Sequence, residues 1–365
     1  MKKFFAMLLV GCLAVAMFTG CSGGNESEPE APTLSGEIEV IQDAQEDEVE
    51  VVPEGMARSY LTGEWIDEEL AAKRPIAVML GNTTAALPQY GIGEAEVIYE
   101  VPVEGGLVRL MAIIQDYENL EKLMSIRSCR HYFVHWAMEY DAIYTHYGQA
   151  YLAEDILKQS YVDNINGLDG TIEYIVFSRD NSRKAPHNAY SNGEDLAAGI
   201  AKKGYDTALD ASYEGHFLFD KDDNSEITLD NGTEATYIKP GYAINKPWFE
   251  YNAEDGLYYR YQHNAAHIDA VDGDQLACKN IILQVCDWSV ADKEQGYLDI
   301  NTTSGGHGYY VTNGKVVPIT WSKDSITATT NYYGEDGSEI VLNQGKTWIC
   351  IIQNTYENEV TFVEE

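Results

Sequence analysis

The side chains best suited to bind a polar ligand are concentrated in residues 125–148, SIRSCRHYFVHWAMEYDAIYTHYG. Guanidinium groups bind phosphate and carboxylate through planar pairs of donors, and imidazole groups exchange protons near neutral pH. Two arginines three residues apart, near a predicted helix start, also lie close to free backbone N–H groups that favour an anion. The candidate binding residues of this stretch are Arg127, Arg130, Asp141, Tyr144 and His146.

The two arginines also have a structural interpretation, because arginines of an acidic protein commonly pair with carboxylates inside the fold. The candidate partners are Glu104, Glu139 and Asp141. Residues three apart on a helix start lie about 60° apart around the helix axis. The spacing therefore predicts that one of Arg127 and Arg130 is structural, while the other faces a cleft shared with His146 and His187.

A second group of candidate binding residues lies in the loop RKAPHNAYSN, residues 183–192. Pro186 restricts the backbone there, and loops often present exposed polar side chains to ligands. The binding candidates are Lys184, His187 and Asn188. The alternative is a turn before a helix, in which Asn188 caps backbone groups.

The third group is the pair His267 and Asp269, which would share one face of a strand. A His–Asp pair can activate a serine or cysteine nucleophile. However, the predicted domains after residue 57 have no GxSxG motif, and the run Ser304-Gly305-Gly306-His307 lacks the strand–turn–helix context of a nucleophile elbow. A hydrogen bond that orders a loop is therefore the favoured interpretation of the pair.

Other catalytic patterns are incomplete. His131 and His135 have the i, i+4 spacing of zinc ligands, but Tyr132 stands where a metalloprotease helix has glutamate. Glu100 and Glu104 would lie about 13 Å apart along a strand, beyond the roughly 5–9.5 Å of glycosidase carboxylates. The sequence predicts no catalytic set, no metal site and no cofactor.

The elements that position these residues alternate between strand and helix signals from Arg58 onward. Apolar runs predict strands at 74–80, 96–103, 107–115, 141–147 and 174–178. A Glu-Gly-Gly turn at 104–106 predicts a hairpin between two of them. Helices are predicted at 129–140 after a Ser128 cap, at 151–159, and at 193–203 between Asn192 and Gly204. This pattern predicts an α/β N-terminal domain, a mixed sheet with helices, at residues 58–205.

The second half has a different pattern. Asn-Gly and Asp-Gly dipeptides recur between runs rich in β-branched and aromatic residues, such as NIILQVC and KVVPITW. These dipeptides are typical of tight hairpin turns. Residues 206–365 are therefore predicted to form a mainly antiparallel β C-terminal domain.

The N-terminus has the pattern of a lipoprotein signal. Residues 1–20 combine Lys2 and Lys3, a short apolar run and small residues before Cys21, as in a signal peptide that ends in a bacterial lipobox. The alternative is an ordinary signal peptide with an incidental cysteine. Residues 21–57 are predicted to be lipidated at Cys21 and to continue as a disordered acidic tether. The protein would then be extracytoplasmic, lipid-anchored to the outer face of the cell membrane.

Charge and cysteine content restrict the remaining possibilities. The formal net charge of −35 argues against nucleic acid as a partner, because nucleic-acid binding requires a basic surface. Residues 22–57 hold 11 acidic residues and no Lys or Arg. The cysteines beyond Cys21 are Cys129, Cys278, Cys286 and Cys350. They have no CxxC spacing, so buried free thiols are favoured over one disulfide to Cys350.

Six segments together resemble the YerB-like family of bacterial lipoproteins, a two-domain family without an established activity. They are RPIAVML (74–80), VEGGLVRLMAI (103–113), IRSCRHYFVHWAMEYDAIYTHYG (126–148), APHNAYSN (185–192), YRYQHNAAHID (259–269) and NQGKTWICII (343–352). The resemblance implies an α/β domain and a β-rich domain on a lipidated tether, and no substrate. The chain departs from the family at Arg130-His131, where members commonly have Arg-Pro.

Two function hypotheses follow from the sequence. The first is a non-enzymatic envelope lipoprotein that binds an anionic wall polymer or an envelope protein partner of cell-wall synthesis. The second is an envelope hydrolase or transferase that acts on glycan or peptide with His and Asp acid–base groups. Convergence of His146, His187 and an acidic group in one cleft would favour the second.

Overall fold

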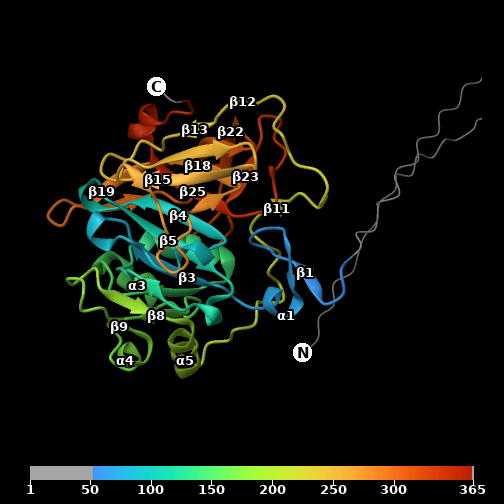
Figure 1. Ribbon diagram of the computed structural model, residues 1–365. Coiled ribbons are helices and arrows are strands. Elements are labelled where there is room, and N and C mark those ends of the chain that lie inside the picture. The colour runs from blue at the N-terminus through green and yellow to red at the C-terminus, as the bar shows by residue number, and fades with distance from the viewer. Residues whose placement is uncertain (1–51, 364–365) are drawn as a thin grey trace, which may run out of the picture. The chain divides into compact units, whose positions relative to one another are not determined.

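Apolar strands from both halves of the chain join in one mixed, 11-stranded sheet in the computed structural model, which describes residues 52–363 (Figure 1). The predicted signal peptide, Cys21 and most of the predicted tether lie outside the described residues. The strands, in spatial order, are β12 (Thr233–Glu234), β22 (Lys315–Ser322), β21 (Gly306–Thr312), β18 (Asn280–Cys286), β25 (Thr347–Gln353), β4 (Val97–Pro102), β5 (Val108–Ile114), β3 (Ile76–Gly81), β7 (Ile143–His146) and β8 (Asn164–Asn166), with β23 (Asn331–Tyr333) beside β22.

The sheet passes from one predicted domain to the other where β25 and β4 pair in parallel, from Thr347 opposite Val97 to Cys350 opposite Glu100. Six of its strands, β18, β25, β4, β3, β7 and β8, point in the same direction, and β5 runs antiparallel between β4 and β3. The strands β12, β22 and β21 are joined only by antiparallel pairs. The fold class is confirmed: a mixed sheet with helices first, then mainly antiparallel strands.

Both faces of this sheet are buried, which explains why its strands are continuous apolar runs instead of alternating ones. In β3 the side chains of Ile76 and Val78 enter one core, and those of Ala77 and Met79 enter the other. Helix α5 (Gly193–Lys203) and strand β14 (Trp248–Asn252) pack into the first core, and helix α2 (His131–Ala137) packs into the second.

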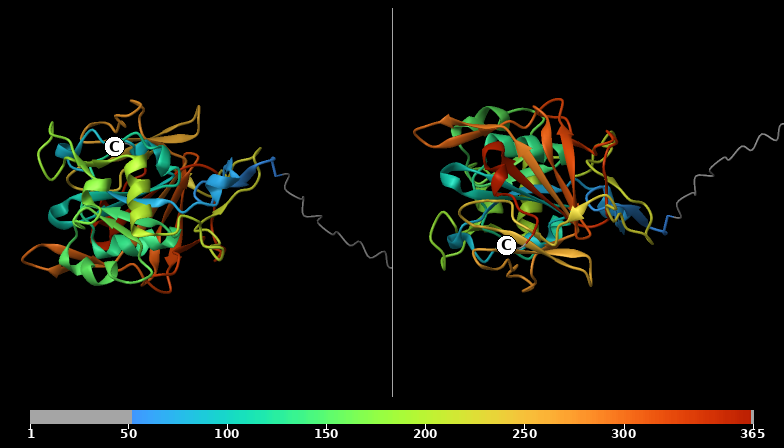
Figure 2. Two further views of the ribbon diagram at one scale, coloured as in Figure 1. Left: turned by 90° about the horizontal axis from the view of Figure 1, so that it is seen from below. Right: turned by 90° about the horizontal axis from the view of Figure 1, so that it is seen from above.

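Smaller elements surround the sheet. Figure 1 shows α3 (Glu154–Leu157), α4 (Glu173–Val176) and α5 gathered at the β8 end of the sheet. A five-stranded sheet consists of β13 (Tyr237–Ile238), β14 (Trp248–Asn252), β15 (Leu257–Gln262), β16 (Ala265–Ala266) and β17 (Ala277–Cys278). The hairpin of β19 (Trp288–Asp292) and β20 (Tyr297–Ile300) extends away from the body (Figure 2). The remaining α-helix and strands of the described residues are α1 (Glu68–Ala71), β1 (Met56–Arg58), β2 (Trp65–Asp67), β6 (Leu123–Met124), β9 (Ser178–Arg179), β10 (Ala189–Ser191), β11 (Leu218–Phe219) and β24 (Val341–Leu342).

Two predicted local features are wrong. Residues 174–178 do not form a strand: α4 ends at Val176, and the strand β9 is only Ser178–Arg179. The apolar side chains of residues 174–178 led to the prediction of a buried strand. Tyr174, however, is 88% exposed and does not enter a core. Ser128 does not cap α2 either: its hydroxyl donates to the carbonyl of Tyr147 at 3.0 Å, and the residue at the N-cap is Arg130.

The best-specified helix is α5. The Asn192 side chain accepts a hydrogen bond from the Asp195 amide, and Gly204 ends the helix in the left-handed conformation at φ 71°.

The four cysteines of the described chain are buried free thiols, in agreement with the favoured interpretation. Across residues 52–363, no helix combines the length and the apolar character needed to cross a bilayer.

Candidate functional site

Residues 126–129 lie across one edge of the main sheet, at the carboxyl ends of β3 and β7. The Arg127 amide donates to the Met79 carbonyl, and the Arg127 carbonyl accepts from the Tyr147 amide, both at 2.9 Å. Because β4, β3, β7 and β8 point in the same direction, their following loops meet at this edge. Ligands of open α/β sheets bind at such carboxyl edges, so the position favours a binding role for side chains of this segment.

Arg130 is the structural member of the arginine pair. Its Nε donates to Glu104 Oε2 at 2.9 Å, its NH1 donates to the Cys129 carbonyl at 2.8 Å, and its NH2 pairs with Glu104 Oε1. Arg109 contacts the same carboxylate at 3.5 Å. Burial acts to raise the pKa of Glu104, but the hydrogen bond and charge of Arg130 outweigh it, so the net pKa is lowered. Glu104 is thus an ionised partner of Arg130.

Arg127 has no carboxylate partner among residues 52–363. Its NH1 lies 3.1 Å from Nδ1 of His187. Burial lowers the pKa of His187, and the positive charges of Arg127 and Arg109 lower it further. A neutral His187 then accepts a hydrogen bond from Arg127, and the guanidinium charge stays uncompensated.

A cavity of about 310 Å³ opens beside Arg127. Its wall includes Tyr147, Leu168 and the guanidinium-bearing Arg179, whose Cζ lies 4.2 Å from the centroid of the Tyr147 ring. Arg179 also donates to Asn188 Oδ1 at 2.9 Å. We call this space the Arg127 cavity. Two guanidinium groups at one cavity provide planar donors for a phosphate or carboxylate group.

Other residues predicted for this site lie elsewhere. His146 is fully buried, its Nδ1 bonds the Gly148 carbonyl at 2.8 Å, and burial lowers its pKa to about 4. Tyr144 is buried beside it, with ring centroids 5.2 Å apart. Asp141 lies 3.3 Å from Arg74 Nε. None of these three lines the Arg127 cavity.

The loop residues are separated by their environments. Lys184 is exposed, His187 is partly buried against Arg127, and Asn188 is buried and accepts from Arg179. This loop lines the Arg127 cavity with Ala185, Pro186 and Ala189. His187 and Asn188 lie outside the lining and contact its two arginines. The sequence gives no signal of this role, because Arg127 is 60 residues from His187 and no motif pairs Arg179 with Asn188.

His267 and Asp269 do not form a dyad. His267 Nε2 contacts Gln89 Oε1 at 2.5 Å, and its Nδ1 lies 2.8 Å from Arg260 NH1. The Asp269 carboxylate accepts from the amides of Gly91 at 2.9 Å and Gly93 at 2.6 Å. Each residue therefore fastens the C-terminal half to residues 89–93.

The two predicted helix histidines point to separate partners. His131 Nε2 lies 3.0 Å from Asp299 Oδ1, and His135 Nδ1 lies 2.8 Å from Thr302 Oγ1. Within the described range no three His, Cys, Asp or Glu side chains converge as metal ligands would.

Sequence reasoning missed two buried charge clusters. Glu100 pairs with Arg260 at 2.7 Å, and both side chains are 0% exposed. Glu139 pairs with Lys323, also at 0% exposure, and accepts the Thr330 amide at 3.1 Å. A single charged residue within an apolar run, as in VIYEVP, was the available signal. Its partner is not visible locally.

The comparisons with known proteins agree with this architecture. Residues 61–206 match the family model "Protein of unknown function (DUF3048) N-terminal domain", and residues 236–349 match the corresponding C-terminal domain model. YerB of Bacillus subtilis (strain 168), which its name describes as a lipoprotein, is 27% identical over 299 residues, 81% of this chain and 86% of YerB. The crystal structure of YerB from Bacillus subtilis aligns with a TM-score of 0.72 at 26% identity, and covers 84% of this chain and 100% of that one. The chain therefore belongs to the YerB-like family, whose two parts are the DUF3048 domains.

Proposed function

We propose that this protein is a lipid-anchored extracytoplasmic binding protein that recognises an anionic group, such as that of a wall polymer, in the Arg127 cavity. The observation that carries the proposal is the uncompensated guanidinium of Arg127 in a chain of net charge −35. A half-buried arginine without a carboxylate partner is costly in such a protein unless an external anion pairs with it.

The geometry supports binding more than hydrolysis. The hydrolase hypothesis requires His146, His187 and an acidic group in one cleft. His146 is buried away from the Arg127 cavity, and Glu104, the nearest acid to Arg130, is engaged by that arginine. What remains at the cavity is a set of donors, which suits recognition of phosphate or carboxylate.

Membrane attachment through Cys21 is the second part of the proposal, supported by the lipobox and by the lipoprotein name of YerB. We expect Cys21→Ser to release the protein from the membrane or to leave an unprocessed precursor, because two acyl chains are lost. Fractionation of cells into membrane and soluble parts measures this. Normal processing with full membrane retention would contradict it.

Sulfate is the probe for the binding part, because it stays a dianion between pH 5 and 8. We expect Arg127→Gln to weaken sulfate binding by about tenfold, as one charge-assisted contact is lost. Binding should strengthen as the pH falls, because protonation of His187, whose pKa is lowered in the free protein, adds positive charge next to Arg127. Histidine NMR resonances followed during the titration report both effects.

The matched control is Lys202→Gln, which removes one positive charge on the exposed side of α5. Its sulfate affinity should equal that of the unmodified chain. Equal losses in the two variants, or none in Arg127→Gln, would show that the Arg127 cavity is not the anion site.

A further inference from the structure

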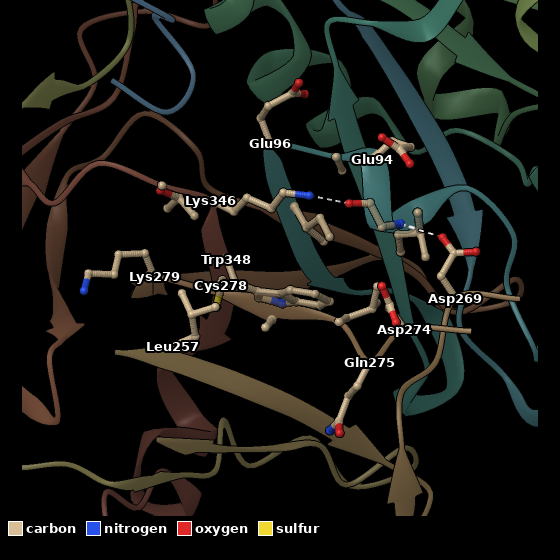
Figure 3. Close-up of a pocket in the computed structure, with 18 of the residues that line it drawn as sticks. Glu94, Glu96, Leu257, Asp269, Asp274, Gln275, Cys278, Lys279, Lys346 and Trp348 are labelled. Carbon is tan, nitrogen blue, oxygen red and sulfur yellow. Dashed lines mark hydrogen bonds between the residues drawn. The ribbon is translucent and has the colours of Figure 1, made fainter. Parts of the chain in front are cut away.

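A second cavity, of about 480 Å³, opens between the segment before β4 and the β15, β17 and β25 region (Figure 3). It lies where residues matched by the two family models meet. Such junctions are frequent ligand sites, and the volume is in the range of small-molecule pockets. None of the candidate binding residues at the Arg127 cavity lines it.

The cavity combines an apolar wall with a charged rim. Trp348, Ile98 and Leu276 contribute apolar surface. Six carboxylate residues and two lysines also line it. One of the lysines, Lys279, is neutralised by Glu226 at 2.9 Å. The field inside the cavity is therefore negative, which repels anionic ligands and attracts cations.

An ammonium group of the protein already occupies this field. Figure 3 shows the Lys346 side chain extended across the cavity, above the Trp348 ring, with its Nζ directed at the backbone carbonyl of Gly93. That carbonyl is held in place because the Gly93 and Gly91 amides both donate to Asp269, at 2.6 and 2.9 Å. The acceptor for an ammonium group is thus preorganised.

Glu96 is another carboxyl residue of the cavity lining. Glu96 accepts the Gln115 amide at 3.1 Å, and burial raises its pKa to about 7, against the opposing effect of Lys346. A cation bound nearby would stabilise its ionised form.

We propose that this cavity binds a small molecule with a primary ammonium group and an apolar body. The ligand's ammonium replaces that of Lys346 at the Gly93 carbonyl, and its apolar body packs on the Trp348 wall. Lys346 is then an internal competitor that swings out to solvent when the ligand enters, as an exposed, flexible lysine can.

The test uses the full-length protein and two probes of similar shape, 2-phenylethylammonium and 3-phenylpropionate, by titration calorimetry. We expect the ammonium probe to bind at least tenfold tighter than the carboxylate probe. Glu96→Gln should weaken the ammonium probe about tenfold, and Lys346→Ala should tighten it by a similar factor because the competitor is gone.

Two controls make the result specific. Glu335→Gln, the same change on an exposed turn, should leave ammonium binding unchanged. Arg127→Gln should also leave it unchanged, so this site is tested independently of the anion site. Equal affinities for the two probes, or no response to either Glu96→Gln or Lys346→Ala, would overturn the proposal.

Discussion

Replacing Glu100 with Gln is expected to lower the free energy of unfolding by about 3–5 kcal/mol, the usual cost of breaking a buried ion pair by removing one charge. The partner, Arg260, is 0% exposed and would keep its charge without a counterion. Chemical denaturation followed by tryptophan fluorescence measures the loss.

The contacts around this pair explain the large effect. Arg260 NH2 donates to both oxygens of Glu100, at 2.8 and 2.7 Å. Asn245 and Trp348 donate to the same carboxylate at 2.8 and 3.3 Å. The guanidinium carbon also lies 4.5 Å from the centroid of the Trp348 ring. Since β4 belongs to the first half and β15 to the second, this network joins the halves beneath the main sheet.

Two variants control for the interpretation. Glu234→Gln neutralises an exposed strand carboxylate and should change stability by no more than about 0.5 kcal/mol. The double variant Glu100→Leu with Arg260→Met should be more stable than Glu100→Gln, because no unpaired charge remains. If Glu100→Gln lowers the free energy of unfolding no more than Glu234→Gln does, the Glu100–Arg260 pair does not stabilise the fold.

Periodicity was sufficient for elements whose signals are local. The strand at 76–81 is a short apolar run, and α5 is delimited by Asn192 and Gly204. Sequence patterns within one segment could not identify the Glu100–Arg260 pair. Its members are 160 residues apart, and the tertiary fold brings β4 and β15 together. The same limit applied to His267, whose partner Gln89 is 178 residues away.

The candidate site was predictable only in part, because several of its contacts join residues that are far apart in the sequence. Helical spacing predicted different roles for Arg127 and Arg130, but its premise is wrong: α2 begins only at His131, and Arg130 at its N-cap is extended. The different contacts of the two arginines follow from tertiary structure, in which Arg130 meets Glu104 and Arg127 meets His187.

Strand spacing wrongly predicted that His146 shares a cleft with Arg127. The His146 ring is buried instead and bonds the carbonyl of Gly148, two residues later in the chain. Arg179, which lines the Arg127 cavity, was not selected, because it lies between the predicted strand at 174–178 and the candidate loop at 183–192.

The separation of the two arginines leads to a second large effect. Arg130→Ala is expected to lower the free energy of unfolding by about 3 kcal/mol, the lower end of the range for a broken buried pair. Its guanidinium is 6% exposed, and the partner Glu104 is 26% exposed and retains Arg109 at 3.5 Å, which limits the loss.

Arg127→Ala is the matched comparison, three residues away in the same segment. It should cost no more than about 1 kcal/mol, because no carboxylate loses its partner, while sulfate binding falls. The two variants should therefore lose different properties. Arg130→Ala should unfold at a lower denaturant concentration, whereas Arg127→Ala should keep its stability but bind the anion weakly. Two equally destabilised variants would mean that both arginines are structural. The uncompensated charge of Arg127 would then be part of the fold and not a site for an external anion.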